Sequence, residues 1–169
     1  DPRVIASVIV SSQNIGNDFL AALDEYGITV DEKKYVKLVI MPNQTIWHID
    51  YGPFPMLRKS DGVLAFTDFI YYGPRHIDDA IPSRMANDVI KDITVFRMPF
   101  PFEGGNIQAD GKGKCMTSTR ALSNTGFSAE KVRNQLKHYV GCEETFIVKD
   151  ITDDGTGHID MFFKWVDED

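Results

Sequence analysis

FEGGNIQADGKGKCMTST, residues 102–119, carries an acid against two glycines and then a second pair of glycines around Lys112. Adjacent glycines let the backbone visit positive φ and leave room for another group to approach closely. An Asp-Gly pair between two strand-like runs is a strong hairpin signal, so we expect strands at 106–110 and 114–119 with a turn at 110–113. Taken alone, the stretch is a hairpin with a surface acid, Glu103, at its base.

Strand-like and helix-like patterns alternate along the rest of the chain. Short apolar runs predict strands at 4–10, 35–41, 64–71, 93–98, 146–148 and 159–166, the first two of them buried. The strand at 93–98 is expected to break at Pro99 and Pro101. One-sided apolar spacing predicts helices at 17–26 and 78–90, and a further helix after the N-cap Ser128. This alternation favours an α/β fold with mixed sheets, and the length favours a single domain over residues 1–169.

Composition narrows the classes of partner. The net charge of −7 argues against nucleic acid and anionic lipid and mildly favours a cationic substrate. The chain has no apolar run long enough for a membrane span and no signal peptide at its start, so we expect no membrane partner. A start without Met indicates a processed or cut chain, and both the cytoplasmic and the secreted compartment stay open.

Cysteine and histidine usage is sparse. Cys115 and Cys142 are too few for a disulfide scaffold; they either pair once or are both small buried hydrophobic residues, which is the commoner fate. His48, His76 and His138 form no ligand pattern, so we expect no metal and no cofactor.

Four segments carry a family resemblance, in this order along the chain: WHIDYGP at 47–53, GPRHIDDAIP at 73–82, GGN with DGKG at 104–113, and GHID at 157–160. They resemble the agmatine deiminase and bacterial, Porphyromonas-type, peptidylarginine deiminase family of the guanidino-group-modifying superfamily. That family has W-x-R-D-x-G-P, a Gly-Gly-Asn or Gly-Gly-Ser strand leading to D-G-x-G, and G-H-V-D. Single short motifs recur by chance, but ordered sets rarely do.

The resemblance implies both a fold and a reaction. The fold would be a pentein-type α/β propeller of ββαβ modules, of which this chain forms about half, the N-terminal part of a deiminase catalytic domain. The reaction would hydrolyse the guanidino group of peptidyl-arginine or agmatine, the latter in putrescine biosynthesis, to a ureido group and ammonia. A cysteine thiolate would carry the amidino intermediate. The family's cysteine lies beyond the end of this sequence, so we expect this chain alone to be nearly inactive.

By the same resemblance, His158, Asp160 and Asp50 are the catalytic residues. The histidine would shuttle protons, while the carboxylates accept hydrogen bonds from the planar guanidinium and balance its charge. His158 and Asp160 are two residues apart, so if both stand on a strand they point to the same face. Without the resemblance, Asp50 would be interpreted as a turn-capping acid and His158 as a structural histidine.

Three further residues are candidates for substrate binding. Trp47 could stack on the cation, Arg75 could hold a substrate carboxylate, and Glu103 suits a substrate with a second amine. Ile49 stands where the family has an arginine. The alternative is therefore a non-catalytic guanidinium-binding or regulatory module. An exposed module face would also seek a partner, either in a homo-oligomer or in the missing C-terminal half.

Overall fold

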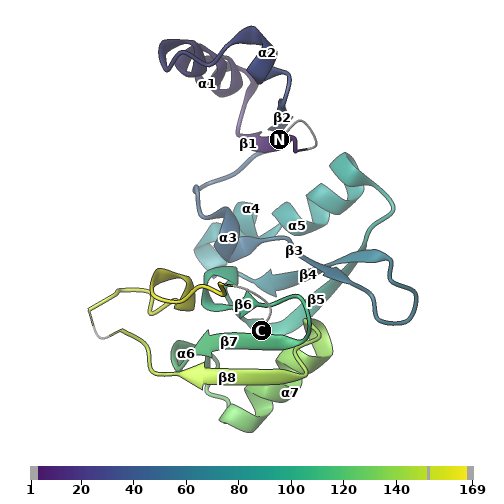
Figure 1. Ribbon diagram of the computed structural model, residues 1–169, viewed down its shortest axis with the longest axis vertical. Coiled ribbons are helices and arrows are strands. Elements are labelled where there is room, and N and C mark those ends of the chain that lie inside the picture. The colour runs from purple at the N-terminus through teal and green to yellow at the C-terminus, as the bar shows by residue number, and fades with distance from the viewer. Residues whose placement is uncertain (1–3, 152, 167–169) are drawn as a thin grey trace. The chain divides into compact units, whose positions relative to one another are not determined.

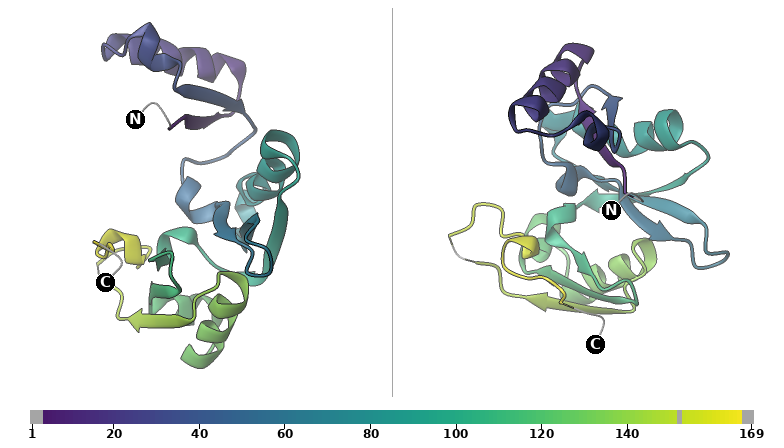
Figure 2. Two further views of the ribbon diagram at one scale, coloured as in Figure 1. Left: turned by 45° about the vertical axis from the view of Figure 1, so that its right-hand side comes forward. Right: turned by 45° about the horizontal axis from the view of Figure 1, so that its top comes forward.

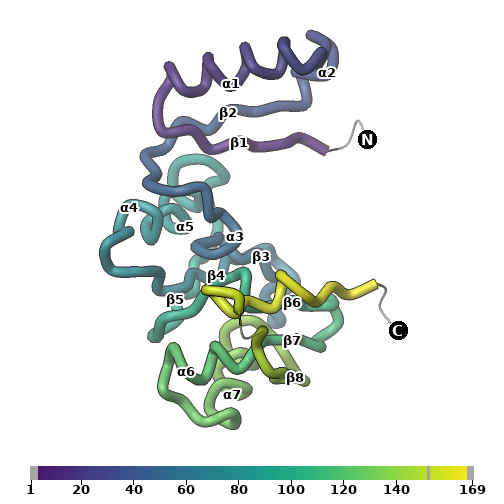
Figure 3. The backbone as a smooth tube through the Cα atoms, turned by 90° about the vertical axis from the view of Figure 1, so that its left-hand side faces the viewer, coloured from purple at the N-terminus to yellow at the C-terminus, as the bar shows by residue number. Residues whose placement is uncertain are grey.

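The computed structural model describes residues 4–151 and 153–166, and the chain divides into two units, residues 1–46 and 47–169. The first unit contains β1 (Ala6–Val10), α1 (Gln13–Glu25), α2 (Val30–Lys33) and β2 (Val36–Ile40). β1 and β2 pair in parallel, and α1 runs along one side of the pair (Figure 3).

Local sequence explains why α1 begins and ends where it does. The Ser12 side chain accepts a hydrogen bond from the N–H of Ile15 and caps the first turn. Gly27, at φ +75°, supplies the left-handed residue just beyond the end. The helix predicted at 17–26 is confirmed, with an earlier start. The strands predicted at 4–10 and 35–41 are confirmed too, but they are not buried throughout: β1 and β2 each contain a single buried residue, Val10 and Val39, because one helix covers one side of the pair.

The second unit begins with a sheet ordered β3-β4-β5. Its elements are α3 (His48–Tyr51), β3 (Phe54–Leu57), β4 (Leu64–Ile70) and β5 (Thr94–Pro101). β3 is antiparallel to β4, and β5 is parallel to it. The strand predicted at 64–71 is confirmed, and the break expected at Pro99 and Pro101 is confirmed in part: β5 continues to Pro101, where it ends, but its register with β4 shifts between Arg97 and Pro101. β5 is an edge strand, where the missing proline N–H removes no bond from the sheet interior.

The single helix expected at 78–90 is broken into short pieces. They are a 3-10 turn η1 (Gly73–Arg75), α4 (His76–Asp79), α5 (Ile81–Arg84) and a π-helical segment η2 (Met85–Ile90). Pro82 stands in the first turn of α5, where its missing N–H is tolerated, but it cannot continue a helix arriving from α4. Residues 78–90 are thus helical, as the apolar spacing predicts, but the proline divides them into separate pieces.

A second sheet, ordered β6-β7-β8, contains the predicted hairpin. Its elements are a 3-10 turn η3 (Gly104–Asn106), β6 (Gln108–Ala109), β7 (Lys114–Ser118), α6 (Arg120–Thr125), α7 (Ala129–Tyr139) and β8 (Glu144–Val148). β6 and β7 are antiparallel, which confirms the hairpin, while β7 and β8 are parallel (Figure 1). Ser128 accepts from the N–H of Lys131 and caps α7, as expected, and α7 runs along the β7–β8 pair (Figure 2).

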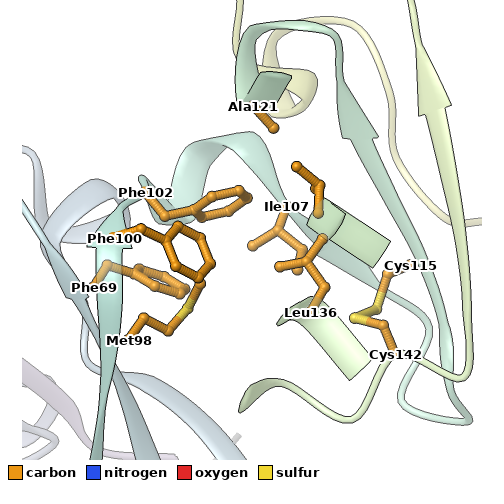
Figure 4. Close-up of a cluster of buried hydrophobic side chains, with 10 residues drawn as sticks. Phe69, Met98, Phe100, Phe102, Ile107, Cys115, Ala121, Leu136 and Cys142 are labelled. Atoms are coloured by element: carbon orange, nitrogen blue, oxygen red, sulfur yellow. A yellow bond between two sulfur atoms is a disulfide. The ribbon is translucent and has the colours of Figure 1, made fainter. Parts of the chain in front are cut away.

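The core of the second unit lies between its two sheets. Phe69, Met98, Phe100 and Phe102 come from the first sheet and its exit, and they face Ile107, Leu136 and the cysteine pair (Figure 4). Burying each large apolar side chain contributes about 1.5–3 kcal/mol. Cys115 and Cys142 are both buried and form a disulfide, so of the two alternatives left by the sequence the single pairing is confirmed, and the commoner one, two separate buried thiols, is wrong.

The C-terminal segment departs most from expectation. The strand predicted at 159–166 is wrong: a 3-10 turn, η4 (Ile159–Met161), stands at its start, and the three sheets include no strand from residues 159–166. The segment is instead fixed by the Trp165 side chain, whose Nε1–H donates to the carbonyl of Gln108 at 3.3 Å.

None of the helices in the described part of the chain has the length and apolar character that a membrane-spanning helix requires.

Candidate functional site

The η3 turn is pressed against the turn that carries Asp50. A Cβ added to Gly104 would lie 1.9 Å from the carbonyl oxygen of Ile49, a distance that no side chain could adopt. Only glycine therefore allows α3 and η3 to touch. On the other side of α3, Tyr51 is fully buried with its ring 5.6 Å from that of Tyr71, which anchors the short helix.

Three ionisable side chains from two distant segments converge on Gly105. A Cβ at this position would lie 2.5 Å from His158 Nδ1, 2.6 Å from Asp50 Oδ1 and 3.0 Å from Asp160 Oδ2. Asp50 belongs to α3, while His158 and Asp160 belong to the segment that enters η4. Asp50 and Asp160 thus converge, and His158 and Asp160 do reach the same place, but through a 3-10 turn and not by alternation along a strand.

The imidazole of His158 lies between two carboxylates. Its Nδ1 is 3.4 Å from Asp50 Oδ1 and its Nε2 is 3.2 Å from Glu103 Oε2, and the side chain is only 5% exposed. Nε2 is within ion-pairing distance of Glu103 but is not aligned for a hydrogen bond with any described residue. Burial by itself lowers the pKa of His158, but Glu103 first, and then Asp50 and Asp160, outweigh it and raise the pKa above its ordinary value.

The surroundings of Asp50 and Asp160 disfavour the ionised form of both carboxyl groups. Burial raises the pKa of each, only partly offset by the charge of His158, and for Asp50 the neighbouring Glu103 and Asp160 add to the rise. The Gly105 N–H also donates to Asp50. Asp160 Oδ1 is buried and accepts no hydrogen bond from the described part of the chain. A buried carboxylate oxygen without a donor is expensive, so this oxygen is suited to an N–H brought in by a ligand.

Glu103 is held as an anion. Burial favours the neutral acid, but the close approach of His158 and Tyr72, with the charges of His158 and Arg75, outweighs it and lowers the pKa of Glu103. Asn124 Nδ2 also lies 3.5 Å from Glu103 Oε2. Glu103 is therefore not the surface acid at the base of a hairpin that the isolated motif predicts: it is 7% exposed and faces His158.

The remaining candidates lie at the margin. Arg75 Nη1 donates to the Tyr71 hydroxyl at 2.7 Å, and its guanidinium lies 5.3 Å from the ring centre of Tyr72. The positive charge of Arg75 helps to lower the pKa of Glu103, so Arg75 lies near this acid at the edge of the site. The Trp47 side chain is 51% exposed, directly before α3. Tyr72 is not among the residues predicted for the site, and its position directly before the GPRH segment is the one signal in the sequence that could have indicated it.

Within the described residues, no group of three His, Cys, Asp or Glu side chains is arranged to hold a metal ion. Three carboxylates around one imidazole instead make a buried anionic site. Its geometry suits an organic cation with several N–H donors.

Comparisons with known proteins identify relatives that are named for chemistry on a guanidino group. The model of the Porphyromonas-type peptidyl-arginine deiminase family matches residues 5–169. A Mycoplasma mycoides protein named for agmatine deiminase activity is 28% identical over 147 residues, covering 78% of this chain and 40% of the relative. A Listeria monocytogenes protein of the same name is 27% identical over 148 residues, with the same coverage. The chain thus spans about 40% of the length of these relatives.

Solved structures share the fold. The agmatine deiminase of C. jejuni superposes with a TM-score of 0.74 at 20% identity, over 97% of this chain and 46% of that one. The agmatine deiminase of Enterococcus faecalis gives 0.71 at 22% identity, over 90% and 43%. Since the family model spans nearly every residue from Ile5 onward, the chain belongs to the Porphyromonas-type peptidyl-arginine deiminase family.

Proposed function

We propose that residues 47–169 supply the guanidinium-binding and proton-transferring half of a deiminase, which converts the guanidino group of an arginine-like substrate to a ureido group and ammonia. The observation that carries the proposal is the convergence of Asp50, His158 and Asp160 on Gly105, with Glu103 behind the imidazole. Family membership supports the same reaction class.

Recognition of the cation would fall to Asp50 and Asp160. A guanidinium is planar and presents its N–H groups in pairs, which carboxylates can accept two at a time. Each charge-assisted hydrogen bond contributes about 1.5–3 kcal/mol. The unpaired Asp160 Oδ1 would receive one of these N–H groups, and the cation would relieve the mutual repulsion that raises the pKa of Asp50.

Proton transfer would fall to His158. A thiolate adds to the guanidinium carbon, His158 gives its proton to the departing nitrogen, and ammonia leaves. Water then adds to the amidino carbon while His158 takes a proton, and the C–S bond breaks to release the ureido product. A raised pKa suits the first of these steps, because it favours the protonated form of His158, and the neighbouring Glu103 carboxylate stabilises that form.

The attacking thiolate would come from outside these 169 residues. Both cysteines of the chain, Cys115 and Cys142, are joined in a disulfide. The second candidate function rests on this point: with no thiol of its own, the chain could serve as a non-catalytic module that binds guanidinium compounds.

Substrate and assembly belong to the same proposal. A solved neighbour is described as a C. jejuni agmatine deiminase variant with substrate bound, which favours agmatine, whereas Arg75 near Glu103 favours a substrate that also carries a carboxylate, such as peptidyl-arginine. In the full protein, the two units would form part of one domain with a propeller of ββαβ modules, completed by a C-terminal half or by a second copy.

Calorimetry with agmatine and free arginine tests the binding step on this chain. The parent should bind at least one of them, Asp160→Asn should abolish binding, and Asp88→Asn, which changes an exposed acid of the same unit, should not. No heat with either ligand would overturn the proposal. Ammonia release by a longer form that includes the thiol separates the two functions: an enzyme releases ammonia, whereas a binding module binds without turnover.

A further inference from the structure

His158 is carried by a segment without sheet hydrogen bonds. Between β8 and η4 the described residues form no helix or strand, yet the position of the imidazole has to be fixed to a fraction of an ångström for proton transfer. Something outside the segment must hold it. Several side chains from the end of β7 and the start of α6 hold it, and the one next to His158 is Ser118, whose Oγ donates to the carbonyl of Gly157 at 2.6 Å in a buried hydrogen bond.

Ser118 holds the opposite wall of the site as well. Its backbone N–H donates to Asn106 Oδ1 at 3.1 Å, and the hydroxyl of its neighbour Thr117 donates to the Asn106 carbonyl at 2.7 Å. Asn106 ends the η3 turn, which begins directly after Glu103. Asn106, Thr117 and Ser118 are all buried, so these bonds are shielded from water.

Arg120 fixes the direction in which the Ser118 hydroxyl points. The Arg120 N–H donates to Ser118 Oγ at 3.2 Å, which leaves the hydroxyl proton for Gly157. The Arg120 side chain donates from Nε to the Thr156 carbonyl and from Nη2 to that of Gly155. Gly157 itself has φ +64°, and a Cβ there would lie 2.9 Å from Arg120 Nε, so the segment is clamped against the end of β7.

We propose that Ser118 is a positioning residue: its hydroxyl and its N–H together set the distance between the His158 imidazole and Glu103. Ser118 touches neither substrate nor reacting atoms. Its catalytic meaning rests on the proposed deiminase function, but its effect on His158 does not.

The sharpest test compares Ser118→Thr with Ser118→Val. The two side chains have nearly the same shape and differ in one hydroxyl. NMR titration of the histidine rings reports His158 directly, and agmatine binding reports the assembled site. We expect the threonine variant to titrate and bind like the parent. In the valine variant, His158 should titrate at lower pH, because it loses its fixed approach to Glu103, and agmatine affinity should fall about tenfold, as the loss of a single good contact would cause.

Ser123→Ala is the matched control. Ser123 Oγ donates to the Arg120 carbonyl on the exposed side of α6, so its loss removes a neighbouring hydroxyl outside the network. It should leave the His158 titration unchanged.

Identical His158 titrations in the threonine and valine variants would overturn the proposal. Should the valine variant fail to fold, the threonine variant decides, because a His158 pKa that moves although the hydroxyl is kept also overturns it. Failure of the proposed function has a different signature: no parent or variant binds a guanidinium ligand, while the valine change still moves the His158 titration.

Discussion

The His158 Nε2 atom lies 3.2 Å from Glu103 Oε2, so an acid from the start of the hairpin region becomes the partner of a histidine near the C-terminus. The acids of the site differ in the direction in which their pKa values are shifted. Glu103 has a lowered pKa beside the imidazole, whereas Asp50 and Asp160 have raised pKa values and converge on Gly105, where we propose that the guanidinium binds. Three carboxyl groups with similar ordinary pKa values therefore differ in the folded chain because their surroundings differ.

Glu103→Gln should lower the pKa of His158. The pair raises the pKa of His158 in the folded state above 6.5, so its stabilisation is present below pH 6.5 and is lost as the pH rises through the folded-state value. The amide keeps the shape but removes the charge, and His158 should then titrate at a lower pH in an NMR experiment. His48 is the internal reference, since burial lowers its pKa without a contribution from Glu103. An unmoved His158 would contradict the pairing.

Gly105→Ala should abolish guanidinium binding and leave the chain folded. The added methyl would stand where the His158, Asp50 and Asp160 atoms converge, and these side chains would have to move apart. Misplacement of a reacting group by about 1 Å costs about 100-fold in rate, and we expect a loss of similar size in agmatine affinity, measured by calorimetry. Gly155→Ala, which meets open space on the His158 segment, is the control. Parent-like binding in Gly105→Ala would be incompatible with this site.

Asp68→Asn should flatten the pH dependence of stability. Asp68 is 1% exposed, its Oδ2 accepts from Arg97 Nη1 at 2.7 Å, and burial raises its pKa from 3.8 to about 6. The folded state therefore holds this proton more tightly than the unfolded chain. The resulting stabilisation is present below pH 3.8 and is lost as the pH rises through about 6, by up to about 3 kcal/mol.

Urea denaturation of the parent and of Asp68→Asn at pH 4.5 and pH 7.5 measures this change. The variant should gain stability relative to the parent at the higher pH. Asp61→Asn removes an exposed acid with a lowered pKa and should leave the difference between the two pH values as in the parent. If Asp68→Asn follows the parent at both pH values, the Asp68 carboxylate does not carry this dependence.

Removal of the disulfide should destabilise the second unit. Cys115 and Cys142 are separated by 27 residues, and closing a loop of that length in the unfolded chain contributes about 3.5 kcal/mol in the chain-entropy description. The double variant Cys115→Ala, Cys142→Ala should unfold at lower urea concentration and become insensitive to reductant. The parent should show the same loss only when reducing agent is added. Equal midpoints for the reduced and oxidised parent would exclude a stabilising role.

The features that the sequence predicts correctly depend on hydrogen bonds between residues close together in the chain. The hairpin depends on Asp110, whose Oδ1 accepts from the N–H groups of Lys112 and Lys114, and such turn bonds involve neighbours in the chain. The same holds for Ser128 at the start of α7. The strand expected at 159–166 failed because a strand requires a partner, and pairing is not encoded in the apolar run itself.

The turns, the helix caps and the mixed α/β class can be predicted from the amino-acid sequence, and the family resemblance adds the acids and the histidine that could bind and transform a guanidinium. The pairing of Cys115 with Cys142, the inward position of Glu103 beside His158 and the bond from the end of β7 to the His158 segment are visible only in the folded chain. The difference lies in the separation along the chain of the residues that interact. A cap or turn is stabilised by residues a few positions apart, whereas the site exists only when buried, oppositely charged groups from distant segments are brought together, and their pKa values follow from that proximity.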